Sequence, residues 1–413
     1  MTPTPSPPLP DEDAVTGLLR GVIDPELGSD IVDLGMVKAV DIVADGTVTV
    51  TVALTTAGCP LRAQIQRDIR TRVGSLDGVS DVQLTWTEMD KEDKARTMER
   101  ARANAQGESP DTQVPATTRV VAVASGKGGV GKSSVTANLA TALAARGLSV
   151  GVLDADIWGF SIPRMLGIDG RMSGDPEGGR ITPHELAVGD GHLHVVSMGF
   201  LVDDEGSALM WRGLMLNRAV QHFLEDVAWP RDLDYLIIDM PPGTGDVQMG
   251  LARMMPRAEM VIVTTPAKGA QKVAVRAADM ARRSHLRVAG VIENMSAFIC
   301  DHGDTYALFG SGGGEQLAHD AGIPLLGSIP LESAVGQGGD DGAPIALDDG
   351  PAAEAFRALA ETVATEAIPP IEMQGCTAHI LDAVNTAVSA ATDTAGTDDQ
   401  SPVAGEGQPV QIG

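Results

Sequence analysis

The chain of 413 residues is poor in aromatic residues and in cysteine. It contains only 4 Trp, 2 Tyr and 6 Phe, so we expect its core to consist of Val, Ile, Leu, Ala and Met. Its three cysteines, Cys59, Cys300 and Cys376, are too few and too scattered for a disulfide framework, and no basic signal-peptide start precedes Arg20. These absences predict a globular protein of the reducing cytoplasm.

Positive charge is also scarce. The chain has 30 Lys and Arg against 56 Asp and Glu, a net charge of −26, which repels nucleic-acid backbones and anionic lipids. The longest uncharged, mostly apolar run near the middle, residues 133–145, includes Ser, Thr and Asn and is shorter than the roughly 20 residues that cross a bilayer. We therefore expect a soluble protein with no nucleic-acid partner and no membrane partner.

The length exceeds what one hydrophobic core usually supports, which predicts more than one domain. Composition sets the expected boundaries, because polar, proline-rich or acidic segments cannot bury enough apolar surface to offset the loss of chain entropy. The expected parts are a disordered N-terminus (1–10), a small α+β domain (11–90), a linker (91–117), a P-loop ATPase domain (118–366) and an acidic, largely disordered tail (367–413).

The small domain reads as helix, hairpin, helix and strand, with Asp45-Gly46 at the hairpin turn. The larger domain contains continuous apolar runs with helical stretches between most of them. These runs are 119–124, 148–153, 193–197, 235–238, 260–263, 286–292 and 325–329. Such runs are typical of strands buried on both faces, and intervening helices force parallel crossovers. The sequence predicts an α/β fold with a doubly wound, mainly parallel sheet.

A glycine-rich loop between the first of these strands and a helix predicts a phosphate site. The expected nucleotide contacts are Gly126, Lys127, Gly128, Gly129, Val130, Gly131, Lys132, Ser133 and Ser134. Glycines allow backbone N–H groups to surround a phosphate, and the N-terminus of the next helix adds partial positive charge. Lys132 would neutralise the outer phosphates, and Ser133 would hold Mg²⁺.

Carboxylates end two of the expected strands, at Asp154 and Asp156 and at Asp239 and Asp246. Both strand ends should emerge beside the phosphate loop, where open α/β sheets bind ligands. Asp239 suits Mg²⁺ binding, Asp156 suits the orientation of attacking water, and Asp154 and Asp246 are further switch carboxylates. A capping or turn role remains the alternative for each of them.

Lys127, at the start of the loop, distinguishes this sequence from ordinary phosphate loops. It resembles the second lysine of the deviant Walker A ATPases, which include MinD, ParA and the nitrogenase iron protein. In that group two protomers enclose nucleotide, and this lysine reaches the partner's phosphates. The resemblance implies a homodimeric ATPase in which Lys127 acts with Lys132, Asp156 and Asp239 in ATP hydrolysis. A solvated surface lysine is the alternative.

Longer motifs resemble the Mrp/ApbC iron-sulfur carrier proteins. The matching segments of the larger domain are 158–167, 211–213, 240–248 and 293–296, and those of the small domain, which resembles an iron-sulfur assembly domain, are 24–26, 33–37 and 58–61. The resemblance implies an ATP-dependent protein that holds an Fe-S cluster, of the 4Fe-4S type, and passes it to apoproteins. Its partners would be a second copy, recipient apoproteins and Fe-S assembly proteins. It also implies that Asn294 contacts adenine.

One feature departs from that family. Its members usually bind the cluster through a Cys-x-x-Cys pair after the Asn-Met-Ser motif, whereas this chain has only Cys300 there, followed by Asp301 and His302. Two protomers would supply two thiolates, and His302 or Asp301 are candidate additional ligands because histidine replaces cysteine on iron in some clusters. The alternative is an ordinary loop cysteine.

Cys59 is a second candidate thiol. It precedes Pro60 and the helix expected through Val73, so its sulfur would lie at the positive end of that helix, which lowers a thiol pKa. A cluster ligand or reactive thiol and a buried packing cysteine are the two interpretations.

Three functions remain open on the sequence. The first is an ATP-hydrolysing Fe-S cluster carrier, and the second is an ATP-dependent assembly scaffold or partner that binds no cluster. A positioning ATPase of the MinD and ParA kind is disfavoured, because no Lys or Arg follows Asp382 to form a basic membrane-binding or DNA-binding segment.

Overall fold

The structure is a computed structural model. It describes residues 9–371 except 25–26, 28, 56–60, 91, 98–99, 101–111, 157–158, 171, 175–179, 202–212, 244–245, 301 and 303. The side chains at 173–174, 201, 213–217 and 246–247 also lie outside the description. The expected disordered segments 1–10 and 367–413 therefore fall mostly outside it.

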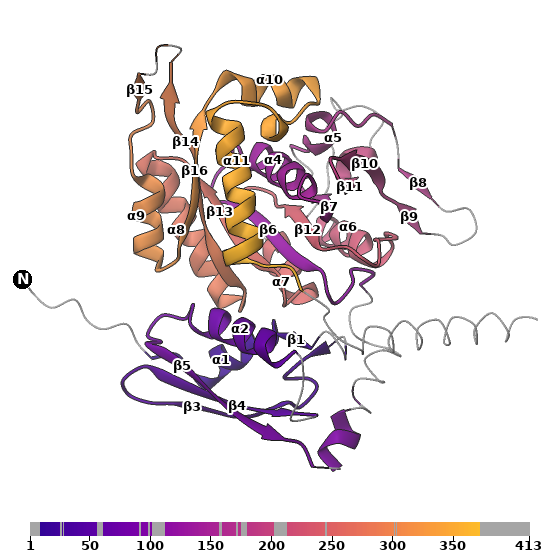
Figure 1. The fold of residues 1–413 in the computed structure, drawn as a ribbon, viewed down its shortest axis with the longest axis vertical. Helices are drawn as coiled ribbons and strands as arrows, with labels where there is room; N and C mark the ends of the chain where they lie inside the picture. The colour runs from indigo at the N-terminus through magenta and orange to yellow at the C-terminus, as the bar shows by residue number, and fades with distance from the viewer. Residues whose placement is uncertain are drawn as a thin grey trace, which may run out of the picture. The chain divides into compact units, whose positions relative to one another are not determined.

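The small N-terminal part contains a three-stranded sheet covered by two helices (Figure 1). Its elements are α1 (Glu12–Leu19), β1 (Ile23–Asp24), β2 (Ser29–Asp30), β3 (Val37–Ile42), β4 (Thr47–Leu54), α2 (Arg62–Val73) and β5 (Asp81–Glu88). The sheet order is β3-β4-β5, with β3 antiparallel and β5 parallel to the central strand. The helix, hairpin, helix and strand order is confirmed, and β1 and β2 form an additional antiparallel pair.

Alternation along β4 explains how this sheet packs. Val48, Val50 and Val52 are fully buried, and the threonines between them are only half-buried. Ile65 and Ile69 of α2 are fully buried in the same cluster, because residues four apart share one helix face. The hairpin turns at Gly46, whose φ of 86° suits glycine, as the Asp45-Gly46 pair predicts.

The larger part is built on a nine-stranded sheet in the order β10-β11-β7-β12-β6-β13-β14-β15, with β16 also paired to β14. Its strands are β6 (Arg119–Ser125), β7 (Ser149–Asp154), β10 (His184–Val188), β11 (Gly191–Ser197), β12 (Tyr235–Asp239), β13 (Glu259–Thr264), β14 (Arg287–Ile299), β15 (Thr305–Tyr306) and β16 (Leu325–Leu331). Only β10 and β15 pair in an antiparallel manner, at β11 and β14. The mainly parallel sheet is thus confirmed, and the seven apolar runs coincide with strands, except that Leu148 and Leu286 lie one residue before β7 and β14.

Helices cover both faces of this sheet. They are α4 (Lys132–Ala144), α5 (Ile162–Met165), α6 (Gly213–Glu225), α7 (Asp246–Met254), α8 (Lys268–Arg283), α9 (Gly313–Ala321), α10 (Ser333–Asp341) and α11 (Pro351–Thr362), with short helical turns η1 (Met198–Leu201), η2 (Ile345–Leu347) and η3 (Val363–Ala367). A separate short pair consists of β8 (Ser173–Gly174) and β9 (Ile181–Thr182).

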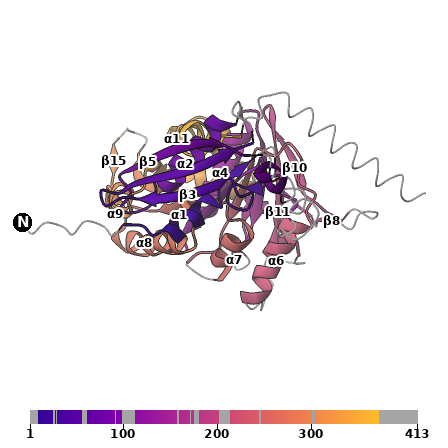
Figure 2. The same ribbon diagram turned by 90° about the horizontal axis from the view of Figure 1, so that it is seen from below.

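Strand β6 shows how the two faces form. Its side chains alternate, so Val120, Ala122 and Ala124 pack with residues of α6, α7, α8 and α9. The intervening Val121 and Val123 pack with α4, α5 and α11. Figure 2 shows α4 and α11 on one side and α6, α7 and α8 on the other. The doubly wound α/β fold is confirmed.

The chain continues to pack after the expected end of the ATPase domain at residue 366. Ile368 is 1% exposed, and its carbonyl accepts a hydrogen bond from the Tyr235 hydroxyl at 2.6 Å. The Pro369 carbonyl accepts one from Nε of Arg119 at 2.9 Å. Within the range 91–117, residues 92–97 are helical. The division into domains otherwise stays a prediction.

Among the described helices, none combines the length and apolar character needed to cross a membrane.

Candidate nucleotide site

The glycine-rich loop adopts a conformation that depends on its glycines. The fully buried strand β6 leads into it, and α4 begins at Lys132 immediately after it. Gly129 and Gly131 have φ angles of 79° and 77°, in the left-handed region that favours glycine. A Cβ at Gly126 would approach the backbone of Val273 within 2.5 Å. The strand, loop and helix therefore follow the order that phosphate binding requires.

Asn294, on β14, contacts the backbone of the glycine-rich loop. Its side-chain amide donates a hydrogen bond to the carbonyl of Val130 at 2.9 Å, and the residue is only 5% exposed. Asn294 thus holds the loop in this structure, and its contact with adenine stays a prediction.

Gly131→Ala should disrupt the loop, because the new Cβ would collide with the Asn294 amide while φ remains left-handed. A non-glycine residue in the left-handed region costs about 1–3 kcal/mol. We expect a lower melting temperature and weaker ATP binding, measured by thermal unfolding and calorimetry. Gly128→Ala is the control for stability, since a Cβ there meets nothing within 4 Å. Equal melting temperatures of the two variants would contradict this role of Gly131.

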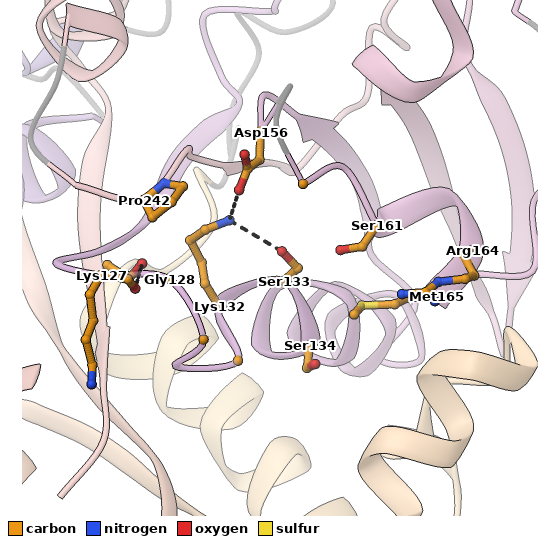
Figure 3. A pocket seen from close by; sticks show the side chains of 14 residues that line it. Lys127, Gly128, Lys132, Ser133, Ser134, Asp156, Ser161, Arg164, Met165 and Pro242 are labelled. Atoms are coloured by element: carbon orange, nitrogen blue, oxygen red, sulfur yellow. Dashed lines mark hydrogen bonds and ion pairs between the residues drawn. The ribbon is translucent and has the colours of Figure 1, made fainter. Parts of the chain in front are cut away.

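The predicted phosphate lysine lies among the predicted metal-site and catalytic groups. Lys132 Nζ lies 2.7 Å from Asp239. It also lies 3.7 Å from Asp156, as the dashed line in Figure 3 marks. The Ser133 hydroxyl donates to Asp239 at 2.6 Å, and the Thr136 hydroxyl donates to the other oxygen of Asp239 at 2.8 Å. Asp239 is fully buried. The structure therefore brings Lys132, Ser133, Asp156 and Asp239 together.

A hydroxyl and a carboxylate in contact at the base of the loop fit a magnesium site, because Mg²⁺ prefers oxygen ligands and retains several waters and phosphate oxygens. Ser133 and Asp239 would hold the ion, which would neutralise phosphate charge when bound. Thr136, which was not among the predicted site residues, lies one helical turn after Lys132 and orients Asp239 by donating its hydroxyl. Its spacing along α4 could have indicated this.

Asp154 makes the contacts of a capping residue, one of the two roles that the sequence left open. Its carboxylate accepts hydrogen bonds from the backbone N–H groups of Asp156, Ser161 and Ile162 at 3.2–3.3 Å. The Ser197 hydroxyl donates to it at 3.0 Å. The capping alternative therefore fits Asp154, which fixes the start of α5. The side chain of Asp246, on α7, lies outside the described part.

Asp154 predicts a dependence of stability on pH. Burial and the nearby Asp239 raise the pKa of Asp154 from 3.8 to about 7. A raised folded-state pKa means that the stabilisation is fully present below the unfolded pKa and is lost as pH rises through the folded one. Without nucleotide, we expect the free energy of unfolding to fall as the pH rises from about 3.8, the unfolded pKa, to about 7, the folded one. Urea titrations of Asp154→Asn should show a flatter profile, and an unchanged one would contradict the assignment.

A pocket of about 420 Å³ opens over these groups. Its lining residues are Ser125, Lys127, Gly128, Gly129, Gly131, Lys132, Ser133, Ser134, Asp156, Gly159, Ser161, Arg164, Met165 and Pro242. Lys127 is exposed, and Figure 3 shows its side chain directed away from Lys132 and Asp156. This orientation leaves Lys127 able to contact groups outside its own phosphate site. Ser161, Arg164 and Met165 of the α5 segment were absent from our sequence prediction.

The predicted cluster residues are only partly described. Cys300 follows β14, is half-buried, and donates its backbone N–H to the Asp304 carbonyl at 3.0 Å. His302 is exposed, whereas Cys59 and Asp301 lie outside the described residues. Within the described segments, no three His, Cys, Asp or Glu side chains are placed to hold a metal ion together.

Two family models match the chain. Residues 116–364 match the NUBPL iron-transfer P-loop NTPase model, and residues 12–86 match the iron-sulfur cluster assembly protein model.

Similar curated proteins include the iron-sulfur cluster carrier protein of Mycobacterium leprae, 44% identical over 81% of this chain and 87% of that protein. The iron-sulfur cluster carrier protein of Synechocystis is 43% identical over 85% of this chain and 96% of that protein.

Solved structures include a nucleotide-binding protein in complex with ADP from Archaeoglobus fulgidus, with 35% identity and a TM-score of 0.48 over 58% of this chain and 91% of that chain. Another is MinD of Aquifex aeolicus, with 24% identity and a TM-score of 0.43 over 61% of this chain and 100% of that one. The family matches confirm the resemblance found in the motifs. The chain therefore belongs to the NUBPL iron-transfer P-loop NTPase family, together with the curated iron-sulfur cluster carrier proteins.

Proposed function

We propose that this chain is a cytoplasmic, ATP-hydrolysing iron-sulfur cluster carrier that works as a homodimer and transfers its cluster to apoproteins. Family membership and the grouping of Lys132, Ser133 and Asp239 at the phosphate loop support the nucleotide part. The half-buried Cys300 supports the cluster part, because it directly follows the strand that also carries Asn294. The single observation that carries the proposal is the Ser133–Asp239 contact of 2.6 Å beside Lys132.

The residues at the loop suggest how ATP is handled. Lys132 is neutralised by Asp239 and Asp156 in the absence of phosphate, so binding of ATP would exchange these carboxylates for phosphate oxygens. Ser133 and Asp239 would then hold Mg²⁺, while Asp156 orients the attacking water. Positioning and charge stabilisation supply most of the catalysis in phosphoryl transfer. The outward direction of Lys127 suits contact with nucleotide bound to a second copy.

The cluster would lie between two copies. Each copy provides Cys300, and Fe-S clusters are held mainly by thiolates, so a second copy would double the thiolates available. His302 and Cys59 are candidates for the remaining ligands, and a 4Fe-4S cluster would need four. The curated relatives are named iron-sulfur cluster carrier proteins, which supports transfer of a cluster to apoproteins. The match of residues 12–86 to the iron-sulfur cluster assembly protein model supports interaction with Fe-S assembly proteins.

Anaerobic reconstitution with iron and sulfide tests this proposal. We expect visible absorption and bound iron in the wild-type dimer, loss of both in Cys300→Ala, and retention of both in Cys376→Ala, the matched control. Cys59→Ala and His302→Ala would then identify the other ligands. A colourless, iron-free wild-type dimer that still hydrolyses ATP would contradict the carrier function.

That last outcome would favour a second function, an ATP-dependent assembly scaffold or partner that carries no cluster. One observation favours it: Cys300 stands alone where the family usually has two cysteines. Addition of the reconstituted protein to an apoprotein, followed by activity of the recipient, separates a carrier from a protein that only assists assembly.

A further inference from the structure

Arg164 is a cation of the nucleotide pocket to which the proposed function assigns no role. It belongs to α5 and lines the pocket together with Ser161 and Met165. Figure 3 shows Arg164 on the side of the pocket opposite Lys127, with the phosphate loop between them. The protein carries a net charge of −26, so cations at the mouth of this pocket matter for attracting a polyphosphate.

The position of Arg164 is set by the sheet. Asp154 ends β7 and accepts the backbone N–H groups of Ser161 and Ile162, which fixes the first turn of α5. Ile162 is fully buried in the core on that face of the sheet. Helix α5 has only four residues, but these contacts fix its position. Arg164 therefore lies beside the pocket.

The ion pair of Arg164, unlike that of Lys132, is largely exposed to solvent, so Arg164 can exchange its partner for another anion. Its side chain is 50% exposed, and its guanidinium lies 3.5 Å from the carboxylate of Asp340, whose side chain is 74% exposed. Exposed ion pairs of this kind contribute only about 0–1 kcal/mol. Arginine binds phosphate oxygens through charge-assisted hydrogen bonds that are stronger than such pairs. A phosphate in the pocket would therefore compete successfully with Asp340.

The Asp340 carboxylate is held near α5 by the backbone. Asp340 lies at the end of α10, and a Cβ on Gly342 would meet the Cα of Gly167 at 2.5 Å. Both glycines have left-handed φ angles, 72° and 65°, so neither could be replaced without strain. This close approach keeps a competing carboxylate beside Arg164 when no nucleotide is present.

We propose that Arg164 binds a phosphate group of the nucleotide and leaves Asp340 to do so. This inference rests on the proposed ATP binding and adds a ligand residue to that site. Without nucleotide, the Asp340 carboxylate pairs with the Arg164 guanidinium that would otherwise bind phosphate. Asp340 therefore competes with the nucleotide and weakens its binding. The same ion pair holds the Arg164 side chain beside the pocket.

Calorimetric titration with Mg-ADP and Mg-ATP tests the exchange. We expect Arg164→Ala to weaken both affinities by on the order of 10- to 100-fold, as for the loss of a charged hydrogen bond. Asp340→Ala should act in the opposite direction and strengthen binding by up to about 5-fold, because it removes the competing carboxylate. In the Arg164→Ala background, the Asp340 substitution should have no effect.

Three comparisons keep this test decisive. Arg146→Ala removes another half-exposed arginine that pairs with an exposed carboxylate, Glu361, and should leave affinity unchanged. Arg164→Lys retains the charge and should recover part of the binding, and thermal unfolding without nucleotide checks that each variant folds. If wild-type protein binds nucleotide but Arg164→Ala binds equally well, or if Asp340→Ala weakens binding, the inference is wrong. If wild-type protein binds no nucleotide, the proposed function itself fails.

Discussion

Lys132→Ala should abolish ATP binding, with an affinity loss of at least about 100-fold in calorimetric titrations. Lys132 is 6% exposed and is the cation that lies against the Ser133 and Asp239 pair, so its removal takes away the charge that meets the outer phosphates. Hydrogen bonds to charged groups are worth about 1.5–3 kcal/mol each, and Lys132 would make more than one. The exposed Lys272→Ala is the matched control and should bind normally.

Lys132→Ala should also lower the free energy of unfolding of the protein without nucleotide. Lys132 pairs with Asp239, which is fully buried, and breaking a buried pair typically costs about 3–5 kcal/mol. The double variant Lys132→Ala, Asp239→Asn removes the unpaired charge and should recover stability without recovering binding. Recovery of ATP affinity in the double variant, or normal affinity in the single one, would refute the assignment of the phosphate site.

Lys127→Ala should separate binding from turnover. Because the Lys127 side chain points away from Lys132 and Asp156, its loss should leave ATP affinity within about 3-fold. Hydrolysis should fall by on the order of 1000-fold or more, the effect of removing a cation that is supplied in trans to the transferring phosphate. Phosphate release assays measure turnover, and light scattering measures dimer formation.

A mixing experiment gives this prediction its control. Lys127→Ala protein combined with an Asp239→Asn protein should recover part of the activity, since such a mixed dimer retains one intact site with an intact lysine from its partner. If Lys127→Ala turns over ATP at the wild-type rate, Lys127 is a solvated surface residue, the alternative interpretation of the sequence.

The parts of the fold that sequence patterns predicted share one physical property. Strands β6, β7, β12 and β13 are buried on both faces, so their central residues are apolar and are recognisable as continuous runs, while polar residues lie only at their ends. Strand β10, with the sequence His-Glu-Leu-Ala-Val, lies at the sheet edge and is half-exposed, so its composition carried no such pattern. The second half of β14 was missed for the same reason, since it is only half-buried.

The residues of the site also differ in whether the sequence could predict them. The loop residues 126–134 could be predicted because phosphate binding restricts them to a local pattern. Asp154 could not be distinguished from Asp156, because capping a helix and orienting water both place an aspartate at a strand end. Arg164 was missed because only the packing of α5 brings it beside the phosphate loop.

Strand β14 carries Asn294, and the candidate cluster ligand Cys300 directly follows it. Asn294 supports the phosphate loop, and Cys300 follows six residues later, which is at most about 20 Å along the chain, because the pairing with β16 is irregular between Asn294 and Phe298. Two unit charges at that separation interact by only about 0.2 kcal/mol in water. If nucleotide binds at the loop and a cluster at Cys300, the direct electrostatic interaction between them would therefore be weak. In that case ATP hydrolysis would act on Cys300 mainly through displacement of β14, whose pairing with β16 is irregular between Asn294 and Phe298.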